Sequence, residues 1–273
     1  MKPAAFEFVR PASLTEAARV LGQGNGGARP VAGCQSLGPM LNLRLATPRV
    51  LVDLTGIPEL AQVTDNGDSV TIGACVTTAY IEDARLPGRG LEALARIARN
   101  IAYRAVRNRG TIGGSLCHAD PAADWVSTLC VFGAQCIVFS ERGRRRIAAD
   151  QFVLGAYENA LQPGEILEAI EIPRLSARGR WGYYKVCRKA GEFASALGAV
   201  IDDEASGRLR AVIGATHGRP IVVADARTLL RQDATLDENA VLALLDRHNV
   251  SDPAARHQQV AALSRAYQQA KQA

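Results

Sequence analysis

The feature that most constrains this chain is a glycine-rich segment from Arg109 to Trp125, which reads R-G-T-I-G-G-S-L-C-H-A-D-P-A-A-D-W. Glycine adopts positive φ at little steric cost, so successive peptide N–H groups can turn toward one concavity and bind an anion such as a phosphate. Thr111 and Ser115 would add hydroxyl donors there. Asp124 would accept hydrogen bonds from sugar hydroxyls, because a carboxylate has several lone pairs and no donor. The segment therefore indicates a nucleotide site, although an isolated glycine pair is more often a tight structural turn.

A second turn that combines glycine with a hydroxyl residue lies near the amino terminus, at Gly33-Cys34-Gln35-Ser36. Alone, such a turn more often joins a strand to a helix than it clamps a ligand. Two such turns favour a pyrophosphate, because that group has enough oxygens for both. A Rossmann dinucleotide fold is disfavoured, since it needs G-x-G-x-x-G between a strand and a helix, whereas the glycines from 24 to 27 follow a predicted helix.

Composition describes an ordinary globular chain of 273 residues, 48% hydrophobic and 22% charged. The net charge of +5 raises the possibility of nucleic-acid binding, but aromatic residues make up only 5% and the basic residues are scattered among 27 acids. A basic stripe that binds nucleic acid is therefore not expected. The densest basic run, Arg142 to Arg146, contains Gly143 and is interpreted as the solvated tip of a hairpin.

The cysteines and the amino terminus bear on metals and on location. The six cysteines form no C-x-x-C pair and the four histidines are isolated, so we expect no zinc or iron-sulfur cluster held by this chain alone. A proline at position 3 and Glu7 interrupt any signal-peptide pattern. No segment approaches the roughly 20 apolar residues of a membrane helix. We therefore expect a cytoplasmic protein with reduced thiols and no membrane span.

Hydrophobic periodicity and capping signals predict helices and antiparallel strands that segregate along the chain, which indicates an α+β class. Helices are predicted at 13–21, 37–45, 91–98, 122–132, 224–230, 238–247 and 254–271, with a further one capped by Thr77 or Thr78. The first begins with a capping box, Ser13-x-x-Glu16, and the last is opened by Asp252 and Pro253 at its N-cap and N1 positions. Strands are predicted at 5–9, 50–54, 136–140, 147–148, 166–172, 183–187, 196–201 and 209–215, with a hairpin over 63–73 that turns at Asp65-Asn66-Gly67. Residues 173–180 are the best candidate linker.

Several long motifs resemble the FAD-binding medium subunits of the molybdenum hydroxylases, the xanthine dehydrogenase and carbon monoxide dehydrogenase family. They are V-A-G-C-Q-S-L from Val31, V-R-N-R-G-T-I-G-G-S from Val106, H-A-D-P-A-A-D from His118, E-I-L-x-x-I-E-I-P from Glu165 and Y-Y-K-V-C-R-K from Tyr183. The resemblance implies a two-subdomain FAD-binding fold of the vanillyl-alcohol-oxidase/PCMH type, followed by a small antiparallel sheet with helices. The implied domains are 1–56, 57–174 and 175–273.

The same resemblance implies which residues contact FAD. They are Val31, Ala32, Gly33, Cys34, Gln35, Ser36, Thr111, Ile112, Gly113, Gly114, Ser115, Asp124, Leu167 and Lys185, with Phe193 as a candidate cover for one flavin face. No metal ligand or catalytic residue is implied. Cys34 stands where the family usually has glycine, so a negative φ is expected there. A β-branched residue at Gly113 or Gly114 should abolish flavin binding with little loss of fold.

In function, the resemblance implies an oxidoreductase subunit that carries non-covalent FAD. It would take electrons from two-iron two-sulfur clusters of a small subunit, downstream of a molybdopterin-bearing large subunit, and pass them to NAD, a quinone, a cytochrome or oxygen. The complex would be a dimer of heterotrimers. Two alternatives are a self-contained FAD oxidoreductase of the same fold and a scaffold that has lost its flavin. The substrate of the parent complex is not encoded in this chain.

Overall fold

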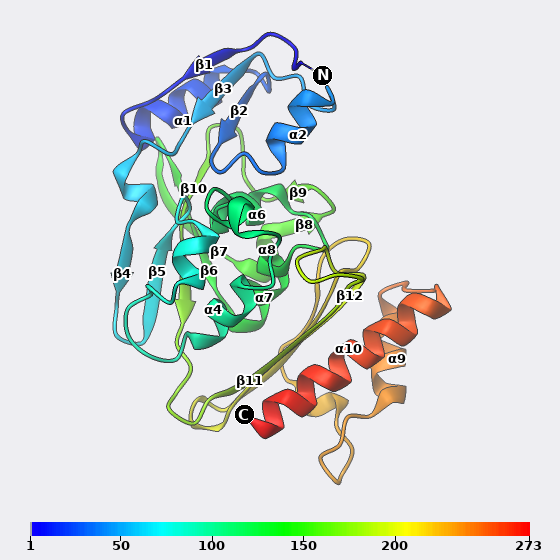
Figure 1. The fold of residues 1–273 in the computed structure, drawn as a ribbon. Coiled ribbons are helices and arrows are strands. Elements are labelled where there is room, and N and C mark those ends of the chain that lie inside the picture. Colours follow the sequence, from blue (N-terminus) through cyan, green and yellow to red (C-terminus); the bar gives the residue numbers. More distant parts are fainter. Residues whose placement is uncertain (1) are drawn as a thin grey trace.

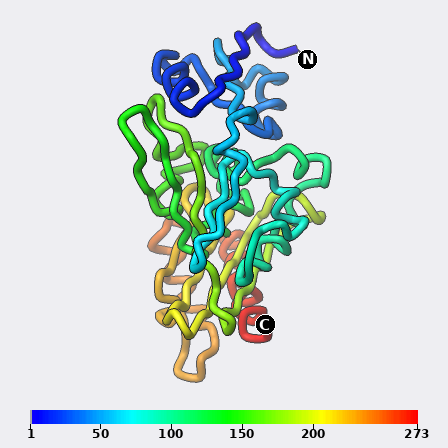
Figure 2. The backbone as a smooth tube through the Cα atoms, turned by 90° about the vertical axis from the view of Figure 1, so that its left-hand side faces the viewer, coloured from blue at the N-terminus to red at the C-terminus, as the bar shows by residue number. Residues whose placement is uncertain are grey.

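The computed structural model describes residues 2–273, and its parts follow one another along one axis of the molecule. The amino-terminal unit lies at one end and the carboxyl terminus at the other, with a central antiparallel sheet between them (Figure 1). The view turned by 90° shows the same order (Figure 2). Helices and mainly antiparallel strands are segregated along the chain, so the α+β class is confirmed.

The amino-terminal unit is a three-stranded parallel sheet in the order β1-β3-β2. Its elements are β1 (Glu7–Val9), α1 (Leu14–Gln23), β2 (Ala28–Val31), α2 (Leu37–Asn42) and β3 (Val50–Asp53). The capping box predicted for α1 is present: Ser13 Oγ accepts a hydrogen bond from the Glu16 N–H at 3.2 Å, and Glu16 Oε2 accepts one from the Ala12 N–H at 2.8 Å. This sheet directs the loop after β2 toward the rest of the protein.

The central unit is built on a five-stranded antiparallel sheet in the order β4-β5-β10-β6-β7. The strands are β4 (Val63–Asp65), β5 (Ser69–Gly73), β6 (Gln135–Ser140), β7 (Gly143–Ala148) and β10 (Ile166–Pro173), and a two-stranded sheet joins β8 (Val153–Gly155) to β9 (Glu158–Asn159). The turn predicted between β4 and β5 is confirmed, because Asp65 Oδ1 accepts from the Gly67 N–H at 2.9 Å and Gly67 has φ +81°.

The hairpin predicted at the basic run is present, but its tip is only Glu141 and Arg142, between β6 and β7. The rest of the run lies in strand β7, which corrects that part of the sequence interpretation. Its arginines lie along β7 and reach acids in or just before β10. The pairs are Arg144 with Glu168, Arg145 with Glu165 and Arg146 with Glu171. These ion pairs reach across the intervening strand β6 and offset the repulsion among the like charges of β7.

Helices of the central unit pack around its sheet. They are α3 (Thr78–Glu82), α4 (Glu92–Ala98), α5 (Arg104–Arg107), α6 (Ile112–His118), α7 (Asp124–Phe132) and α8 (Ala149–Phe152), with a 3₁₀ turn, η1 (Pro58–Ala61). The predicted cap at Thr77 is confirmed, since its Oγ1 accepts from the Tyr80 N–H at 3.2 Å. Every residue of α7 is buried. α7 begins at Asp124, two residues later than predicted, because the Ala122 N–H is turned back to Asp120 Oδ1 at 2.9 Å.

The carboxyl-terminal part is a four-stranded antiparallel sheet in the order β11-β12-β13-β14, covered on one face by α10. Its elements are β11 (Arg180–Val186), β12 (Ala196–Asp203), η2 (Glu204–Ser206), β13 (Arg208–Gly214), β14 (Ile221–Val223), η3 (Ala226–Leu229), α9 (Glu238–Arg247) and α10 (Pro253–Gln272). Three strands and the last two helices match the sequence prediction. The helix predicted over 224–230 is only the 3₁₀ turn η3, which follows the short edge strand β14.

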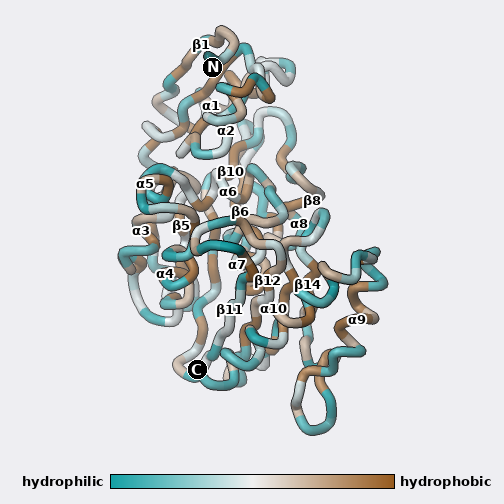
Figure 3. Tube along the Cα trace, turned by 45° about the vertical axis from the view of Figure 1, so that its right-hand side comes forward, coloured by the Kyte–Doolittle hydropathy of each residue, from teal (hydrophilic) through white to brown (hydrophobic). Residues whose placement is uncertain are grey.

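A single hydrophobic core joins the central unit to the carboxyl-terminal sheet. α7 contacts β12 and β13 on the face opposite α10, and the core around α7 includes Leu197, Ile201 and Val212 from those strands. Hydrophobic segments shown in brown run through β5, β12 and α9 (Figure 3). The packing of α7 against β12 and β13 brings the first residue of α7, Asp124, next to side chains of the neighbouring strand β11.

Candidate functional site

Two loops that lie far apart in the sequence meet where the amino-terminal unit faces the central unit. We call residues 31–36 the amino-terminal loop and residues 109–115 the glycine loop. A Cβ built on Gly33 would lie 2.1 Å from the carbonyl oxygen of Arg109 and 2.7 Å from Gly110 Cα. A Cβ on Gly114 would lie 3.8 Å from Ala32 Cβ. The two segments that the sequence singled out are therefore neighbours, and only glycine fits at position 33.

The amino-terminal loop presents a row of free peptide donors. Among residues 2–273, no protein atom accepts a hydrogen bond from the backbone N–H groups of residues 32–36. Buried or half-buried N–H groups are almost always paired. A run of successive unpaired donors at a strand end is the donor set that suits a pyrophosphate, because each phosphate oxygen accepts several hydrogen bonds.

Cys34 lies in this loop with φ +60°, so the negative φ expected from its side chain is wrong. The loop turns sharply after β2, and the left-handed conformation at position 34 accompanies that turn. For a residue other than glycine, this conformation costs about 1 kcal/mol. The Cys34 thiol is partly buried, and burial raises its pKa. It is therefore protonated at neutral pH.

In the glycine loop, by contrast, backbone N–H groups donate hydrogen bonds to other protein atoms. Gly113 donates to the Ala74 carbonyl at 3.0 Å, and Gly114 donates to Thr111 Oγ1 at 3.0 Å, which caps α6. A Cβ on Gly113 would lie 2.4 Å from Ala74 Cβ and 2.7 Å from its Cα. Gly113 thus packs tightly against Ala74 at the end of β5, so we expect a substitution there to disturb the fold as well, contrary to the expectation from the sequence. Gly114 faces the amino-terminal loop instead.

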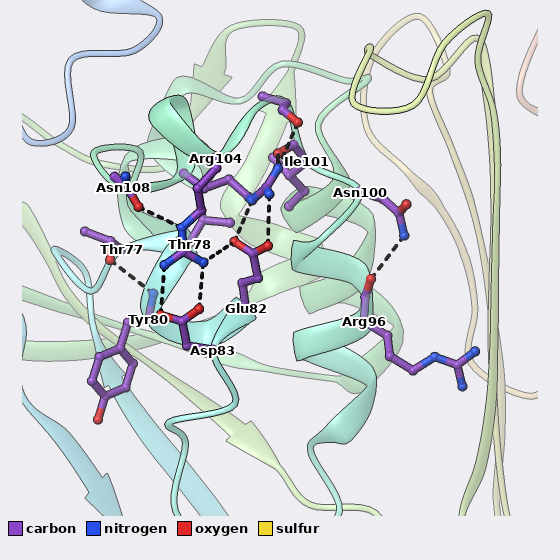
Figure 4. A network of polar contacts seen from close by, with 12 residues as sticks. Thr77, Thr78, Tyr80, Glu82, Asp83, Arg96, Asn100, Ile101, Arg104 and Asn108 are labelled. Atoms are coloured by element: carbon purple, nitrogen blue, oxygen red, sulfur yellow. Dashed lines mark hydrogen bonds and ion pairs between the residues drawn. The ribbon is translucent and has the colours of Figure 1, made fainter.

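A buried arginine holds the segment that leads into the glycine loop. Arg107, 9% exposed, donates from Nε to Glu82 at 2.7 Å and from Nη1 to the carbonyls of Ile101 and Ala102 at 2.8 and 2.9 Å. Figure 4 shows the surrounding network, in which Arg104 binds both Glu82 and Asp83. Sequence reasoning missed Arg107. Two features of the sequence could have indicated it. Glu82 and Asp83 lie together at the end of α3, and Arg104 and Arg107 are three residues apart in α5.

The Arg107 guanidinium also sets the charge of its partner. Its hydrogen bonds hold the pKa of Glu82 below the ordinary value of 4.5. The ion pair joins α5 to α3. It therefore holds the end of α5 in place, and residues 108–110 continue from there into the glycine loop. The glycine loop is also bound directly to α3, because the N–H of Thr78, the first residue of α3, donates a hydrogen bond to the Gly110 carbonyl at 2.8 Å.

Asp124 and Lys185 form a buried ion pair between α7 and β11. Lys185 Nζ lies 3.0 Å from Asp124 Oδ1 and donates to the Asn100 carbonyl at 2.9 Å. The Tyr183 hydroxyl donates to Asp124 Oδ1 at 2.5 Å. Asp124 is 4% exposed, and burial raises the pKa of its carboxyl while the Lys185 ammonium opposes that rise. Burial, together with the charge of Asp124, raises the pKa of Tyr183 well above its usual value.

This ion pair is connected to the glycine loop through hydrogen bonds of Trp125 and Thr78. Trp125, the neighbour of Asp124, donates from Nε1 to Thr78 Oγ1 at 3.1 Å, and Thr78 binds Gly110. Two of the three Lys185 ammonium protons have protein acceptors, which leaves capacity for a third. Trp125 and Thr78 thus link the Asp124–Lys185 pair to the glycine loop.

The other two predicted positions differ in their surroundings. Leu167 is buried, 3% exposed, and pairs with Val138 in the sheet. The backbone carbonyl of the next residue, Glu168, accepts a hydrogen bond from the Ala74 N–H, and the Ala74 carbonyl in turn accepts one from Gly113 in the first turn of α6. Leu167 therefore lies near the start of α6. Phe193 is 61% exposed in the segment after β11, and its neighbour Gly191 bridges to Ile101. Phe193 is thus free to face a ligand or another chain.

An α+β fold in which a loop of free N–H groups lies against a glycine turn has the donor set that suits a pyrophosphate-containing cofactor. Residues 4–175 match the family described as the FAD binding domain in molybdopterin dehydrogenase, and the chain belongs to this family. It is therefore an FAD-binding medium subunit of the molybdenum hydroxylase type, an oxidoreductase component.

Curated relatives and solved structures agree with this assignment. The chain is 35% identical to the nicotine 6-hydroxylase medium subunit of Paenarthrobacter nicotinovorans, over 89% of this chain and 86% of that protein. It is 37% identical to the carbon monoxide dehydrogenase medium chain of Hydrogenophaga pseudoflava, over 74% and 70%. The solved carbon monoxide dehydrogenase of Oligotropha carboxidovorans superimposes with a TM-score of 0.90 at 31% identity, over 100% of this chain and 99% of that one.

Two further observations concern metals and membranes. In the part of the chain from residue 2 onward, no group of three or more His, Cys, Asp or Glu side chains is arranged to hold a metal ion. Among the helices of those residues, none combines the length and the apolar character needed to cross a bilayer. His118 packs beside Tyr157 with ring centroids 5.2 Å apart and the ring planes tilted by 53°, and burial lowers the pKa of its imidazole.

Proposed function

We propose that this chain is the FAD-carrying electron-transfer subunit of a molybdenum hydroxylase. FAD supplies redox chemistry that accepts electrons one or two at a time, and the protein supplies binding and electrostatics. The observation that carries the proposal is the row of unpaired N–H groups at residues 32–36, packed against the glycine loop. The family match and the medium-subunit relatives support it.

The residues present fit FAD, and each has a definable role. The free N–H groups of residues 32–36 would hold the pyrophosphate, and Ser115 would add its hydroxyl from the first turn of α6. Lys185 would donate its remaining proton, and Asp124, whose Oδ2 accepts only from Lys185 among the described residues, would accept from a hydroxyl of the cofactor. Leu167 and Phe193 would provide apolar contact.

Electrons would reach this FAD from other polypeptides. Relatives are named as medium or lettered subunits of larger enzymes, for example subunit alpha of a 6-hydroxypseudooxynicotine dehydrogenase complex. One matching solved structure is described as a carbon monoxide dehydrogenase that lacks the Mo-pyranopterin moiety of its cofactor. We infer a small subunit with two-iron two-sulfur clusters and a large molybdopterin subunit, assembled as a dimer of heterotrimers in the cytoplasm.

A self-contained FAD oxidoreductase is the second candidate. It would require a substrate pocket within this chain, whereas the fold is matched almost end to end by a subunit of a larger enzyme. The experiment that separates the two uses the purified full chain loaded with FAD. We expect dithionite to bleach the flavin, and the substrate of the parent complex to bleach it only after the other subunits are added. Bleaching by that substrate in the isolated chain would support the self-contained enzyme.

A further inference from the structure

Two adjacent tyrosines on β11 point to opposite faces of the carboxyl-terminal sheet. Tyr183 packs in the core shared with α7, and its hydroxyl reaches Asp124. Tyr184 packs in the second core, beneath α10, with its ring 4.7 Å from the Arg265 guanidinium. The same residue type thus occurs at two successive positions, one on the Asp124 side and one away from it.

The Tyr183 hydroxyl restrains the carboxylate to which Lys185 is bound. Asp124 Oδ1 accepts from Tyr183 at 2.5 Å and lies 3.0 Å from Lys185 Nζ, while Oδ2 accepts from Lys185 at 3.1 Å. With Oδ1 fixed by the phenol, the carboxylate cannot rotate freely about its terminal torsion. The Asn100 carbonyl restrains the ammonium from another side at 2.9 Å. Lys185 therefore has one well-defined position in this cluster.

We propose that Tyr183 is a positioning residue of the FAD site, which acts through Asp124 to fix the place and the effective charge of the Lys185 ammonium. This inference rests on the proposed function. Without the phenol, Asp124 would lose a hydrogen bond that offsets part of its negative charge. The carboxylate would then neutralise more of the positive charge of the Lys185 ammonium. Reduction adds negative charge to a flavin, and a nearby cation favours the reduced form, so weaker positive charge should make the reduction potential more negative.

The test compares Tyr183→Phe with Tyr184→Phe in the full chain, using FAD and ADP as separate probes. Tyr183→Phe should raise the FAD dissociation constant by about tenfold, the effect of one hydrogen bond to a charged group. It should also shift the flavin potential to a more negative value. ADP binding, which depends on the two loops, should not change. Tyr184→Phe should leave all three measurements at wild-type values.

A double-mutant cycle with Asp124→Asn tests whether Tyr183 acts through Asp124. When Asp124→Asn is already present, removing the Tyr183 hydroxyl should have little further effect on FAD affinity or potential. Equal FAD affinity and potential in Tyr183→Phe and wild type would overturn the inference, as would an equal loss of ADP binding, which indicates general damage. If the wild-type chain itself bound no FAD, the proposed function would fail and not merely the role of Tyr183.

Discussion

Cys34 and Gly114 are the residues whose backbone surroundings most directly test the account of the two loops. Cys34 has a positive φ in a loop of free N–H groups, and Gly114 faces Ala32 across the junction. Neither property follows from residue type. The sequence placed both in cofactor-binding turns, but the sign of φ at position 34 depends on how the chain turns from β2 into α2.

Replacing Cys34 by glycine should stabilise the chain. Glycine adopts φ +60° without the steric cost, so we expect the free energy of unfolding to rise by about 0.5–1 kcal/mol in chemical denaturation. Cys34→Ala is the matched control, because it removes the thiol but keeps the Cβ, and it should show no gain. Equal stabilisation by both variants would mean that the thiol, and not the backbone conformation, is unfavourable.

Valine at Gly113 and at Gly114 should have different effects. Gly113→Val forces a Cβ against Ala74 and should lower the free energy of unfolding by about 2–3 kcal/mol. Gly114→Val crowds the Thr111 cap, 2.7 Å away, and the face toward Ala32, so FAD binding should be lost with a smaller drop in stability. Gly56→Val is the control, since nothing lies within 4 Å of a Cβ there. Full FAD affinity in Gly114→Val would show that this turn is only structural.

At the scale of elements, the sequence predicted most of the regular structure. The capping signals at Ser13, Thr77 and Asp252 located helix starts correctly, because these caps depend on local hydrogen bonds. The errors arose where contacts with residues distant in the sequence determine the secondary structure. The arginines of β7 pair with acids of β10 across the intervening strand β6, and no local pattern in the basic run contains that information.

The tie between α3 and α5 should depend on pH. The folded-state pKa of Glu82 is depressed by Arg107, so the pair stabilises the fold above the unfolded-state pKa near 4.5, and this stabilisation is lost as the pH falls through the folded-state pKa. Glu82→Gln should lower the free energy of unfolding by about 2–3 kcal/mol at pH 7, with the difference from wild type shrinking below pH 4.5. A difference that persists undiminished at pH 3 would contradict the role of this ion pair.

At the scale of the whole molecule, sequence motifs indicated the family and the α+β class, which the fold and the relatives confirm. The arrangement of the site could be predicted only in part. Gly33 and Gly110 are far apart in the chain, and their contact follows from how two sheets pack. The Asp124–Lys185 pair likewise follows from the packing of α7 on β12 and β13, which places the first residue of a buried helix against a side chain of the neighbouring strand β11.

We expect FAD to be held non-covalently, because the amino-terminal loop offers a row of unpaired peptide N–H groups for the pyrophosphate and burial raises the pKa of its one thiol, Cys34. Acid precipitation of the FAD-loaded chain should leave the yellow colour in the supernatant. Colour that stays with the pellet would indicate a covalent bond and would require a different site.

The measurement that tests the central claim most directly is calorimetric titration of the full chain, stripped of bound flavin, with FAD. The account predicts one FAD per chain, competition by ADP because the two loops hold the pyrophosphate, and loss of binding in Gly114→Val but not in Gly56→Val. Absence of FAD binding by the correctly folded chain, or binding that ADP and Gly114→Val leave unchanged, would contradict it.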